Sequence, residues 1–371
     1  MKVLSIFGTR PEAIKMAPVI KELAQRNGAI ESRVCVTAQH RQMLDQVLTL
    51  FSIQPDFDLD VMRAGQTPTQ VATAVLSGLE PILRAECPDW VLVQGDTTTV
   101  MAASIAAFYN HVKVGHVEAG LRTYDRSQPF PEEINRRIAG VVADLHFAPT
   151  RRAHDNLVHE GVAESMVYVT GNPVIDALRL LSDLPYNPAG GPLAGVPWGK
   201  RLIVVTAHRR ENFGGPMEEI CLALRDIAES DRQGLHVVYP VQLNPNVREP
   251  VLRILGEIPN VSLTEPLEYL PFVHLMRRAT LVLTDSGGIQ EEAPGLGKPV
   301  LVLRDVTERP EAVEAGTVRL VGTDRSRIVG WTRRLLDDPE EYTKMAKAVN
   351  PYGDGYAAPR IVDILSGKGK Q

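Results

Sequence analysis

Three carboxylates and a histidine stand where short apolar runs give way to helical patterns. Asp96 and Glu118 each come directly after a predicted strand, and Glu132 lies in the first turn of a predicted helix. Carboxylates clustered in one site suit acid–base chemistry, because their mutual repulsion drives their pKa values apart. His208 follows a later strand and precedes two arginines, so it could serve as an acid, a base or a phosphate donor.

Each of these residues also has an ordinary structural explanation. Asp96 could cap the helix that follows it, and Glu132 with Glu133 would favour the dipole of a first helical turn. A single histidine is more often structural than catalytic. Glu118 is harder to explain in this way, because a carboxylate at the end of an apolar strand is unfavourable unless it is paired or used. The set as a whole favours a functional site.

Two glycine-containing turns have the composition of anion-binding sites. Arg10, in Gly8-Thr9-Arg10-Pro11-Glu12, would lie at the mouth of a helix whose N-terminus attracts negative charge. Ser286-Gly287-Gly288 also follows a strand, and its glycines let backbone N–H groups approach a diphosphate closely. Glu292 follows about one and a half helical turns later, within reach of the two hydroxyls of a ribose. Plain strand-to-helix turns are the structural alternative.

The composition excludes several classes of protein. The chain has 371 residues and a net charge of -5, so it lacks the overall positive field that coats nucleic acid or anionic lipid. Its three cysteines lie too far apart for a metal motif or a disulfide framework, and no G-x-G-x-x-G dinucleotide fingerprint is present. We find no signal peptide and no membrane-spanning apolar run. These observations predict a cytoplasmic enzyme that uses no metal and no cofactor.

The elements that must position these residues alternate between strand and helix, which predicts parallel sheets covered by helices. The predicted strands are 3–7, 33–37, 90–94, 112–117, 145–148, 201–206, 236–240, 281–285 and 300–303. The predicted helices include 11–26, 43–51, 67–86, 98–109, 131–144 and 217–230. A stretch rich in Pro and Gly, 184–200, interrupts this rhythm and indicates a linker or long loop between two α/β domains. Ligand is expected in a cleft between them, at the carboxyl ends of the strands.

Seven segments together resemble the non-hydrolysing UDP-N-acetylglucosamine 2-epimerases. They are residues 8–12, 94–97, 116–122, 131–136, 171–173, 208–212 and 285–292. Each segment is a weak signal by itself, but the combination is specific. The resemblance runs from about residue 3 to residue 323, which is most of the chain.

The resemblance implies the glycosyltransferase-B architecture, in which two Rossmann-like, doubly wound domains enclose a central cleft. It implies an N-terminal domain at 1–170, completed by a C-terminal helix at about 354–371, and a UDP-binding domain at 171–353. Matching positions carry the catalytic role to Asp96, Glu118, Glu132 and His208. The implied substrate-binding residues are Arg10, Lys15 and Arg136 near diphosphate and sugar, Phe272 at the uracil, Ser286, Gly287 and Gly288 at the diphosphate, and Glu292 at the ribose.

The activity that the resemblance implies is reversible C2 epimerisation of UDP-N-acetylglucosamine to UDP-N-acetylmannosamine by a homodimer, for bacterial cell-surface polysaccharide synthesis. The sugar C2–H has no adjacent carbonyl, so departure of UDP from C1 is needed to acidify it. Elimination would leave 2-acetamidoglucal and UDP, which re-adds after a proton returns to the opposite face. A hydrolysing 2-epimerase, a glycosyltransferase of the same fold and a UDP-sugar sensor are the alternatives. The three carboxylates argue against the last two.

Substrate-activated members of the family also bind UDP-N-acetylglucosamine at an allosteric site. Gln39, His40 and Gln42 resemble part of that site. Gln242, however, stands where the family commonly has His, and Gly65 stands where several regulated members have Arg. A neutral amide and a glycine cannot replace two cation-capable partners of a phosphate. We therefore expect weakened or altered allosteric activation.

Overall fold

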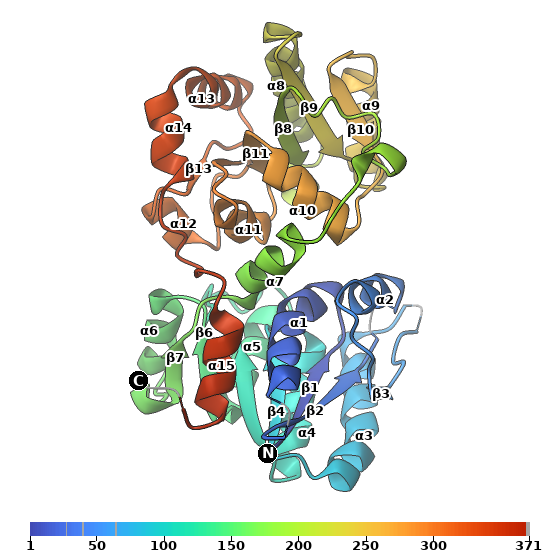
Figure 1. Ribbon diagram of the computed structural model, residues 1–371, viewed down its shortest axis with the longest axis vertical. Helices are drawn as coiled ribbons and strands as arrows, with labels where there is room; N and C mark the ends of the chain where they lie inside the picture. The colour runs from blue at the N-terminus through green and yellow to red at the C-terminus, as the bar shows by residue number, and fades with distance from the viewer. Residues whose placement is uncertain (27, 39–40, 64, 369–371) are drawn as a thin grey trace. The chain divides into compact units, whose positions relative to one another are not determined.

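The computed structural model of the chain divides into two compact units. The first contains Met1–Arg179 and the C-terminal residues from Tyr352 onward, and the second contains Leu180–Pro351 (Figure 1). The structure describes residues 1–26, 28–38, 41–63 and 65–368. Each unit is built around its own parallel sheet, as the alternation of strands and helices predicts.

The first unit contains a seven-stranded parallel sheet in the order β3-β2-β1-β4-β5-β6-β7. Its strands are β1 (Lys2–Phe7), β2 (Glu31–Val36), β3 (Phe57–Asp58), β4 (Trp90–Gln94), β5 (Lys113–Val117), β6 (Leu145–Ala148) and β7 (Val167–Val169). The central strands are runs of buried aliphatic residues, because helices cover the sheet on both faces.

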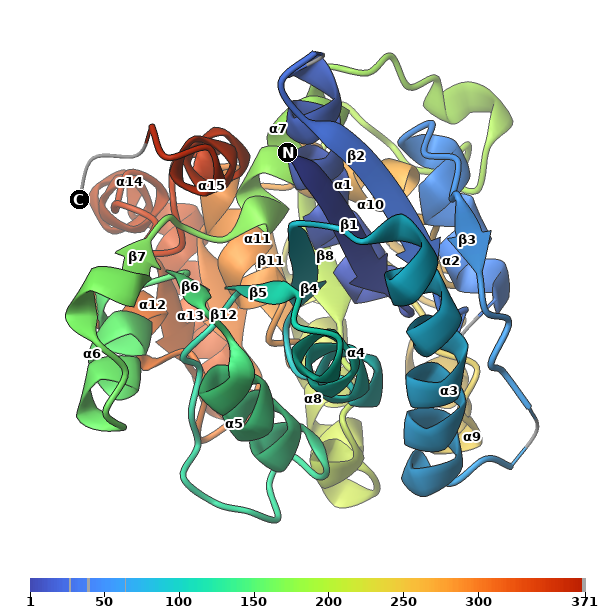
Figure 2. The same cartoon turned by 90° about the horizontal axis from the view of Figure 1, so that it is seen from below.

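The helices of the first unit form two layers, one on each side of its sheet (Figure 2). Helices α3, α4 and α5 pack side by side in one layer, and α1 packs against α2 and α15 in the other. The helices are α1 (Arg10–Gln25), α2 (Arg41–Leu50), α3 (Pro68–Glu86), α4 (Thr98–Tyr109), α5 (Glu132–Val142), α6 (Arg151–His159), α7 (Pro173–Ser182) and α15 (Ala357–Leu365). The last of these follows the whole second unit in the sequence.

The second unit contains a six-stranded parallel sheet in the order β10-β9-β8-β11-β12-β13. Its strands are β8 (Arg201–Thr206), β9 (Leu235–Pro240), β10 (Val261–Thr264), β11 (Leu281–Thr284), β12 (Val300–Val302) and β13 (Val318–Leu320). Its helices are α8 (Gly215–Ser230), α9 (Pro245–Leu255), α10 (Tyr269–Arg278), α11 (Ile289–Gly295), α12 (Pro310–Glu314), α13 (Arg325–Asp337) and α14 (Pro339–Ala346). Helix α8 packs between α9 and α13.

The strand order reverses once in each sheet, and the predicted site residues follow the strands at these points. The reversal lies between β1 and β4 in the first unit and between β8 and β11 in the second. Chains leave such neighbouring strands toward opposite faces, so the strand ends there form a natural ligand crevice. Arg10 and Asp96 follow β1 and β4, and His208 and Ser286 follow β8 and β11.

Four short strands are missing from the sequence-based prediction, and all four lie at sheet edges. β3, β7, β10 and β13 are two to four residues long and only partly buried. An edge strand needs no continuous apolar run, so its pattern resembles that of a loop. The stretch 184–200 also differs from a simple linker, because it belongs to the second unit and buries Leu193 completely.

The first unit extends a few residues beyond the boundary expected at residue 170. The start of α7 is bonded to the C-terminal segment that completes this unit. The Asn172 N–H donates to the Tyr352 carbonyl over 2.7 Å. The buried Asp176 carboxylate accepts the N–H groups of Ala357 and Ala358 at the start of α15, over 3.1 and 2.8 Å. These contacts attach α7 to the first unit as far as Arg179.

In the part of the chain that the structure describes, no helix is long and apolar enough to cross a membrane. The apolar side chains instead form a separate core on each sheet. Val93, Val100 and Leu79 belong to the core of the first unit, and Val237 and Leu224 belong to that of the second.

Two glycines with nearly the same backbone angle provide a test of local packing. Gly120, just beyond Glu118, has a φ of +90°, and a Cβ there would lie 2.1 Å from the Ala153 carbonyl oxygen. Gly161 has a φ of +94°, and a Cβ there would have no other atom within 4 Å. We expect Gly161→Ala to lower the free energy of unfolding by about 1–2 kcal/mol through backbone strain alone. Gly120→Ala should lower it by clearly more, because a backbone atom must also move.

Urea denaturation of both variants measures the difference. Equal losses in the two variants would contradict the close approach of α6 to the segment after β5.

Candidate active site

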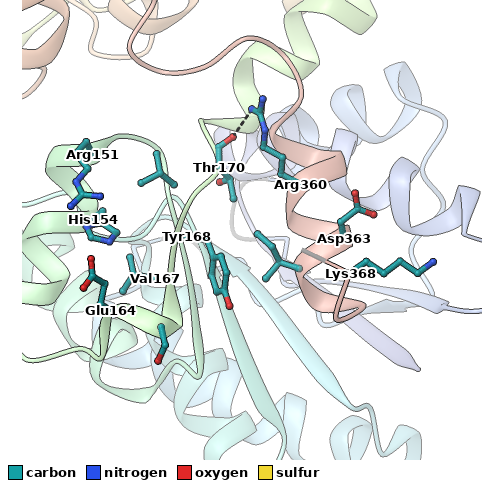
Figure 3. Close-up of a pocket in the computed structure, with 12 residues that line it drawn as sticks. Arg151, His154, Glu164, Val167, Tyr168, Thr170, Arg360, Asp363 and Lys368 are labelled. Carbon is teal, nitrogen blue, oxygen red and sulfur yellow. Dashed lines mark hydrogen bonds between the residues drawn. The ribbon is translucent and has the colours of Figure 1, made fainter. Parts of the chain in front are cut away.

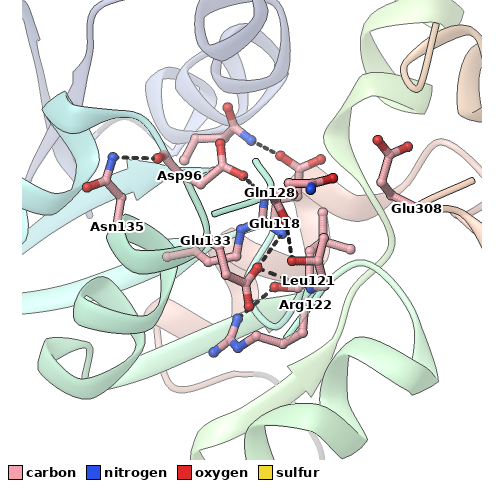
Figure 4. Close-up of polar contacts among 12 residues, drawn as sticks. Asp96, Glu118, Leu121, Arg122, Gln128, Glu133, Asn135 and Glu308 are labelled. Atoms are coloured by element: carbon pink, nitrogen blue, oxygen red, sulfur yellow. Dashed lines mark hydrogen bonds and ion pairs between the residues drawn. The ribbon is translucent and has the colours of Figure 1, made fainter. Parts of the chain in front are cut away.

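Contacts from β5 and α5 hold the turn between β4 and α4. Gly95 adopts a φ of +81°, and its N–H donates to the Val117 carbonyl over 3.0 Å. The Gly95 carbonyl accepts a hydrogen bond from Nε2 of His116 over 2.7 Å. The Asp96 carbonyl accepts one from Nδ2 of Asn135 over 3.1 Å (Figure 4). Hydrogen bonds from β5 and from α5 therefore fix the backbone that carries the Asp96 side chain.

Glu118 presents a buried carboxylate whose two oxygens are both bonded. Its side chain is 5% exposed, and its φ of +62° lies in a region that residues other than glycine rarely adopt. Lys15 Nζ lies 2.6 and 2.7 Å from the two oxygens. Asn172 donates to Oε1 over 2.8 Å, and the Gln94 amide donates to Oε2. One ammonium and two amides therefore stabilise a negative charge directly after β5.

Arg136 lies between the Asp96 carboxylate and the buried carboxylate of Glu133. The guanidinium forms an ion pair with Asp96 and lies 3.5 Å from Oε2 of Glu133. Glu133 is 0% exposed and accepts the N–H groups of Thr123 and Tyr124, each over 3.1 Å (Figure 4). Glu133 thus orders the segment that follows β5, and it helps to orient Arg136 toward Asp96.

Glu132 and Arg10 lie in the first turns of α5 and α1. Glu132 is half-buried, and no described residue forms a hydrogen bond or an ion pair with its carboxylate. Within the first unit, the structure brings Asp96 to Arg136 and Glu118 to Lys15. The two pairs are adjacent because Gln94, which bonds Glu118, ends β4 two residues before Asp96.

His116 and its cross-strand neighbour His146 lie buried beneath this turn as neutral imidazoles. Burial lowers the pKa of His116 to about 3 and that of His146 to about 4. A neutral imidazole carries one proton, and a carbonyl only accepts, so Nε2 of His116 is the protonated nitrogen that faces Gly95. Neither residue can act as a general acid at neutral pH. The role of His116 is structural, because its N–H donates a hydrogen bond to the Gly95 carbonyl.

In the second unit, a buried carboxylate that follows the neighbouring strand β11 holds the backbone at His208. Asp285 is 0% exposed, and its Oδ2 accepts the N–H groups of His208 and Arg209 over 2.7 and 2.8 Å and the Asn212 amide over 3.0 Å. Its Oδ1 lies 3.6 Å from Nδ1 of His208. The imidazole itself is 38% exposed. Asp285 therefore fixes the backbone from which the accessible ring projects.

Two arginines flank the turn Ser286-Gly287-Gly288. A Cβ at Gly287 would lie 3.4 Å from the Arg309 guanidinium carbon and 3.7 Å from a guanidinium nitrogen of Arg209. Glu291 accepts from Nε of Arg309 over 2.8 Å, and Glu308 lies 3.7 Å from Arg209. Glycine at 287 leaves room beside two positive groups, which is a suitable environment for a phosphate.

Glu292 and Phe272 come from α11 and α10. Tyr269, in the first turn of α10, donates its hydroxyl hydrogen bond to Oε2 of Glu292 over 2.9 Å. A Cβ at Gly288 would lie 3.2 Å from the other Glu292 oxygen, so this carboxylate lies against the glycine turn. Phe272 is half-buried, three residues after Tyr269 on the same helix.

Several contributing residues were not singled out as site residues in the sequence. Gln94 and Asn172 bond Glu118, and Arg209 and Arg309 flank Gly287. Asn172 follows β7 in a turn where Gly171 has a φ of +87°, a position comparable to Asp96 after Gly95. A search for polar residues after glycine turns at strand ends could have found it.

The residues expected at an allosteric site are only partly described. Gln39 and His40 lie outside the described residues, as does the side chain of Gln42. Gln242 is exposed after β9, and Gly65 has a φ of +71°, where an added Cβ would meet no other atom within 4 Å.

A cavity of about 860 Å³ lies in the first unit beside edge strand β7 (Figure 3). It is lined in part by Arg151 and His154 of α6 and by Arg360 and Asp363 of α15, and by none of the predicted site residues. Arg360 donates to the Thr170 carbonyl over 3.2 Å.

Among the residues that the structure describes, no group of three or more His, Cys, Asp or Glu is placed to hold a metal ion.

Known proteins resemble this chain over nearly its whole length. The sequence profile of the family described as UDP-N-acetylglucosamine 2-epimerase matches residues 21–366. The UDP-N-acetylglucosamine 2-epimerase of Escherichia coli K12 is 58% identical, over 98% of each chain. The crystal structure of UDP-GlcNAc 2-epimerase from Neisseria meningitidis bound to UDP-GlcNAc is 51% identical, with a TM-score of 0.89 over 98% of this chain and 99% of that one.

A more distant structure shows the fold alone. The glycosyltransferase of kitacinnamycin has a TM-score of 0.66 at 15% identity, over 100% of this chain and 98% of that one. The two parallel-sheet units thus have the expected glycosyltransferase-B architecture. Fold and relatives together define an enzyme of the isomerase class. The chain belongs to the UDP-N-acetylglucosamine 2-epimerase family.

The buried histidines predict how stability depends on pH. An unfolded histidine binds a proton below about pH 6.5, whereas His146 stays neutral in the fold down to about pH 4. The unfolded chain therefore binds more protons between these values, and stability falls as the pH is lowered. His146→Gln should reduce the slope of unfolding free energy against pH by up to about 1.4 kcal/mol per unit between pH 6 and 5.

Urea denaturation at several pH values measures this slope. His159→Gln, which removes an exposed histidine, is the matched control and should leave the slope unchanged. An unchanged slope in His146→Gln would show that His146 is not held neutral by burial.

Proposed function

We propose that the chain interconverts UDP-N-acetylglucosamine and UDP-N-acetylmannosamine without hydrolysis, by elimination and re-addition of UDP. The observation that carries this proposal is the pair of charged contacts after β4 and β5, Asp96 with Arg136 and Glu118 with Lys15. The segments that follow β4 and β5 thus carry preorganised charges of both signs. Such charges suit a reaction that separates an anion from a sugar cation.

The reaction must make C2–H acidic before the proton can leave. When the C1–O bond breaks, its electron pair departs with UDP, and positive charge develops at C1. A base then takes the C2 proton, and the C–H electron pair forms the C1=C2 bond of 2-acetamidoglucal. In the return step a proton adds to the opposite face of C2, and a UDP oxygen bonds to C1. Atoms and electrons balance without any oxidant.

The residues of the first unit divide into fixed charges and exchangeable groups. Glu118 is bonded on both oxygens, so we assign it the role of a fixed negative charge that stabilises the cation and positions Lys15. Glu132 and Asp96 are less enclosed and are assigned the proton transfers at C2. Arg10 and Arg136 would contact the departing diphosphate or the sugar.

The residues of the second unit are assigned to the nucleotide. The arginines beside Gly287 support a diphosphate site at Ser286-Gly287-Gly288, and the bond that holds the His208 backbone to Asp285 supports a role beside it. Glu292 is assigned the ribose hydroxyls, and Phe272 is assigned to the uracil pocket. The structure of the N. meningitidis relative, which is bound to UDP-GlcNAc, supports the choice of nucleotide sugar.

The cellular setting is proposed on the resemblance alone. We propose a cytoplasmic homodimer whose product feeds the synthesis of bacterial cell-surface polysaccharide.

Incubation with UDP-N-acetylglucosamine in deuterium oxide tests the function. We expect deuterium at C2 of the recovered UDP-sugars and the formation of UDP-N-acetylmannosamine. Free N-acetylmannosamine as the main product would mean a hydrolysing epimerase. Unchanged, unlabelled substrate would mean a transferase or a sensor and would overturn the proposal.

Asp96→Asn should abolish the exchange at C2, because the amide cannot accept the proton and loses its charge pairing with Arg136. A positioned acid or base typically contributes roughly 10²–10⁴ to a rate. The melting temperature should confirm that the variant remains folded. Near-normal exchange would refute the catalytic role of Asp96.

Allosteric activation should be weak, because Gln242 and Gly65 offer no cation to a second nucleotide. We expect initial-rate curves against UDP-N-acetylglucosamine that are close to hyperbolic. We also expect the reverse reaction to proceed without added UDP-N-acetylglucosamine. Strong sigmoidality, or an absolute requirement for that addition, would contradict this prediction.

A further inference from the structure

We propose that Glu12 is a positioning residue that fixes the turn carrying Arg10 against the turn carrying Asp96. The inference rests on the proposed function, since it concerns the placement of these two residues. Glu12 lies in the first turn of α1 and is 2% exposed. It is a buried acid that the mechanism itself does not use.

The Glu12 carboxylate joins two turns that are far apart in the sequence. Its Oε2 accepts the N–H groups of Gly8 and Thr9 after β1, over 3.2 and 2.8 Å. Its Oε1 accepts the hydroxyl hydrogen of Thr97 after β4, over 2.8 Å. Arg10 is the next residue after the first pair, and Asp96 is the residue before Thr97. One carboxyl group therefore holds the turn that carries Arg10 against the turn that carries Asp96.

Part of this arrangement is an ordinary helix cap. Thr9 and Glu12 form a capping box, in which the acid at the third helical position bonds the backbone of the cap residue. A capping box explains the contact with Thr9, but it requires neither complete burial nor a bond to another helix. The bond to Thr97 is the additional feature, and it lies at the reversal point between β1 and β4.

The surroundings show that the two turns are closely fitted. A Cβ at Gly8 would lie 2.0 Å from Oγ1 of Thr37 and 2.9 Å from Oγ1 of Thr99. Those two hydroxyls are 3.0 Å apart. Burial raises the pKa of Glu12 to about 7, and the donors from Thr9, Thr97 and Gly8 act against that rise. Burial of a carboxyl group is unfavourable unless hydrogen bonds compensate for it. These same bonds join the two turns, so we expect the turns to separate when the bonds are removed.

Four substitutions test the proposal. Glu12→Ala should lower kcat by about 10–100-fold with KM changed by less than about threefold, since small displacements of reacting groups affect the chemical step most. Glu12→Gln can rebuild all three bonds, because Thr97 can accept from the amide, and it should recover most of the kcat. Thr97→Val should reproduce much of the loss, whereas Thr97→Ser should not.

The matched control is the capping box of α3. Gln70 bonds the Thr67 N–H over 2.9 Å in the same motif, away from the site, so Gln70→Ala should lower only the melting temperature. The loss of kcat in the double variant Glu12→Ala/Thr97→Val should be clearly smaller than the product of the single losses.

Two outcomes would overturn the inference. A normal kcat in Glu12→Ala would show that the contact is only a cap, and an equal loss in Glu12→Gln and Glu12→Ala would show that the charge matters rather than the bonds. These results differ from a failure of the proposed function. If the wild-type enzyme gave no exchange at C2, the roles of Arg10 and Asp96 would fail first, and the positioning role would fail with them.

Discussion

The geometry of the first unit depends on the turn that leaves β4 for α4. Gln94, the last residue of β4, and the three residues that follow it are all bonded to other segments. The bonds join Gln94 to Glu118, Gly95 to His116 and Val117, Asp96 to Asn135 and Arg136, and Thr97 to Glu12. Three elements, α1, β5 and α5, thereby converge on one turn. A turn with so many bonds cannot shift by itself, so the charges around it are preorganised.

In the second unit, the buried carboxylate of Asp285 joins the segments that follow two neighbouring strands. At its strand reversal, Asp285 after β11 bonds the backbone after β8, just as Glu12 after β1 bonds the turn after β4. Both groups are buried carboxylates that accept backbone N–H groups at the start of a functional segment. In each unit a buried carboxyl group bonds the two segments at the reversal point, where two neighbouring strands end without a helix that connects them directly.

The sequence predicts the central strands, the helices and the strand-end residues well, because buried parallel strands are continuous apolar runs and the residues that end them are polar. It does not predict β7 or β13, since edge strands lack that pattern. It also cannot show which acids are paired. Glu132 and Glu133 are neighbours in one helical turn, yet Glu132 is half-buried, whereas Glu133 is fully buried and accepts two backbone N–H groups.

The same limit applies to long-range contacts. The bond between Glu12 and Thr97 joins residues that no local pattern relates, and the contact of Asn172 with Glu118 depends on the order of strands in the sheet. Family resemblance transfers a role to a position, but only the fold shows what restrains the side chain there.

The return of α15 to the first unit has a consequence for the order in which the chain can fold during synthesis. The helix packs on α1, and its first N–H groups bond Asp176, but its residues follow the complete second unit in the sequence. A ribosome therefore releases the last part of the first unit only after the second has emerged. Until then the face of α1 that receives α15 stays uncovered, so the unit that begins the chain is the last to be completed.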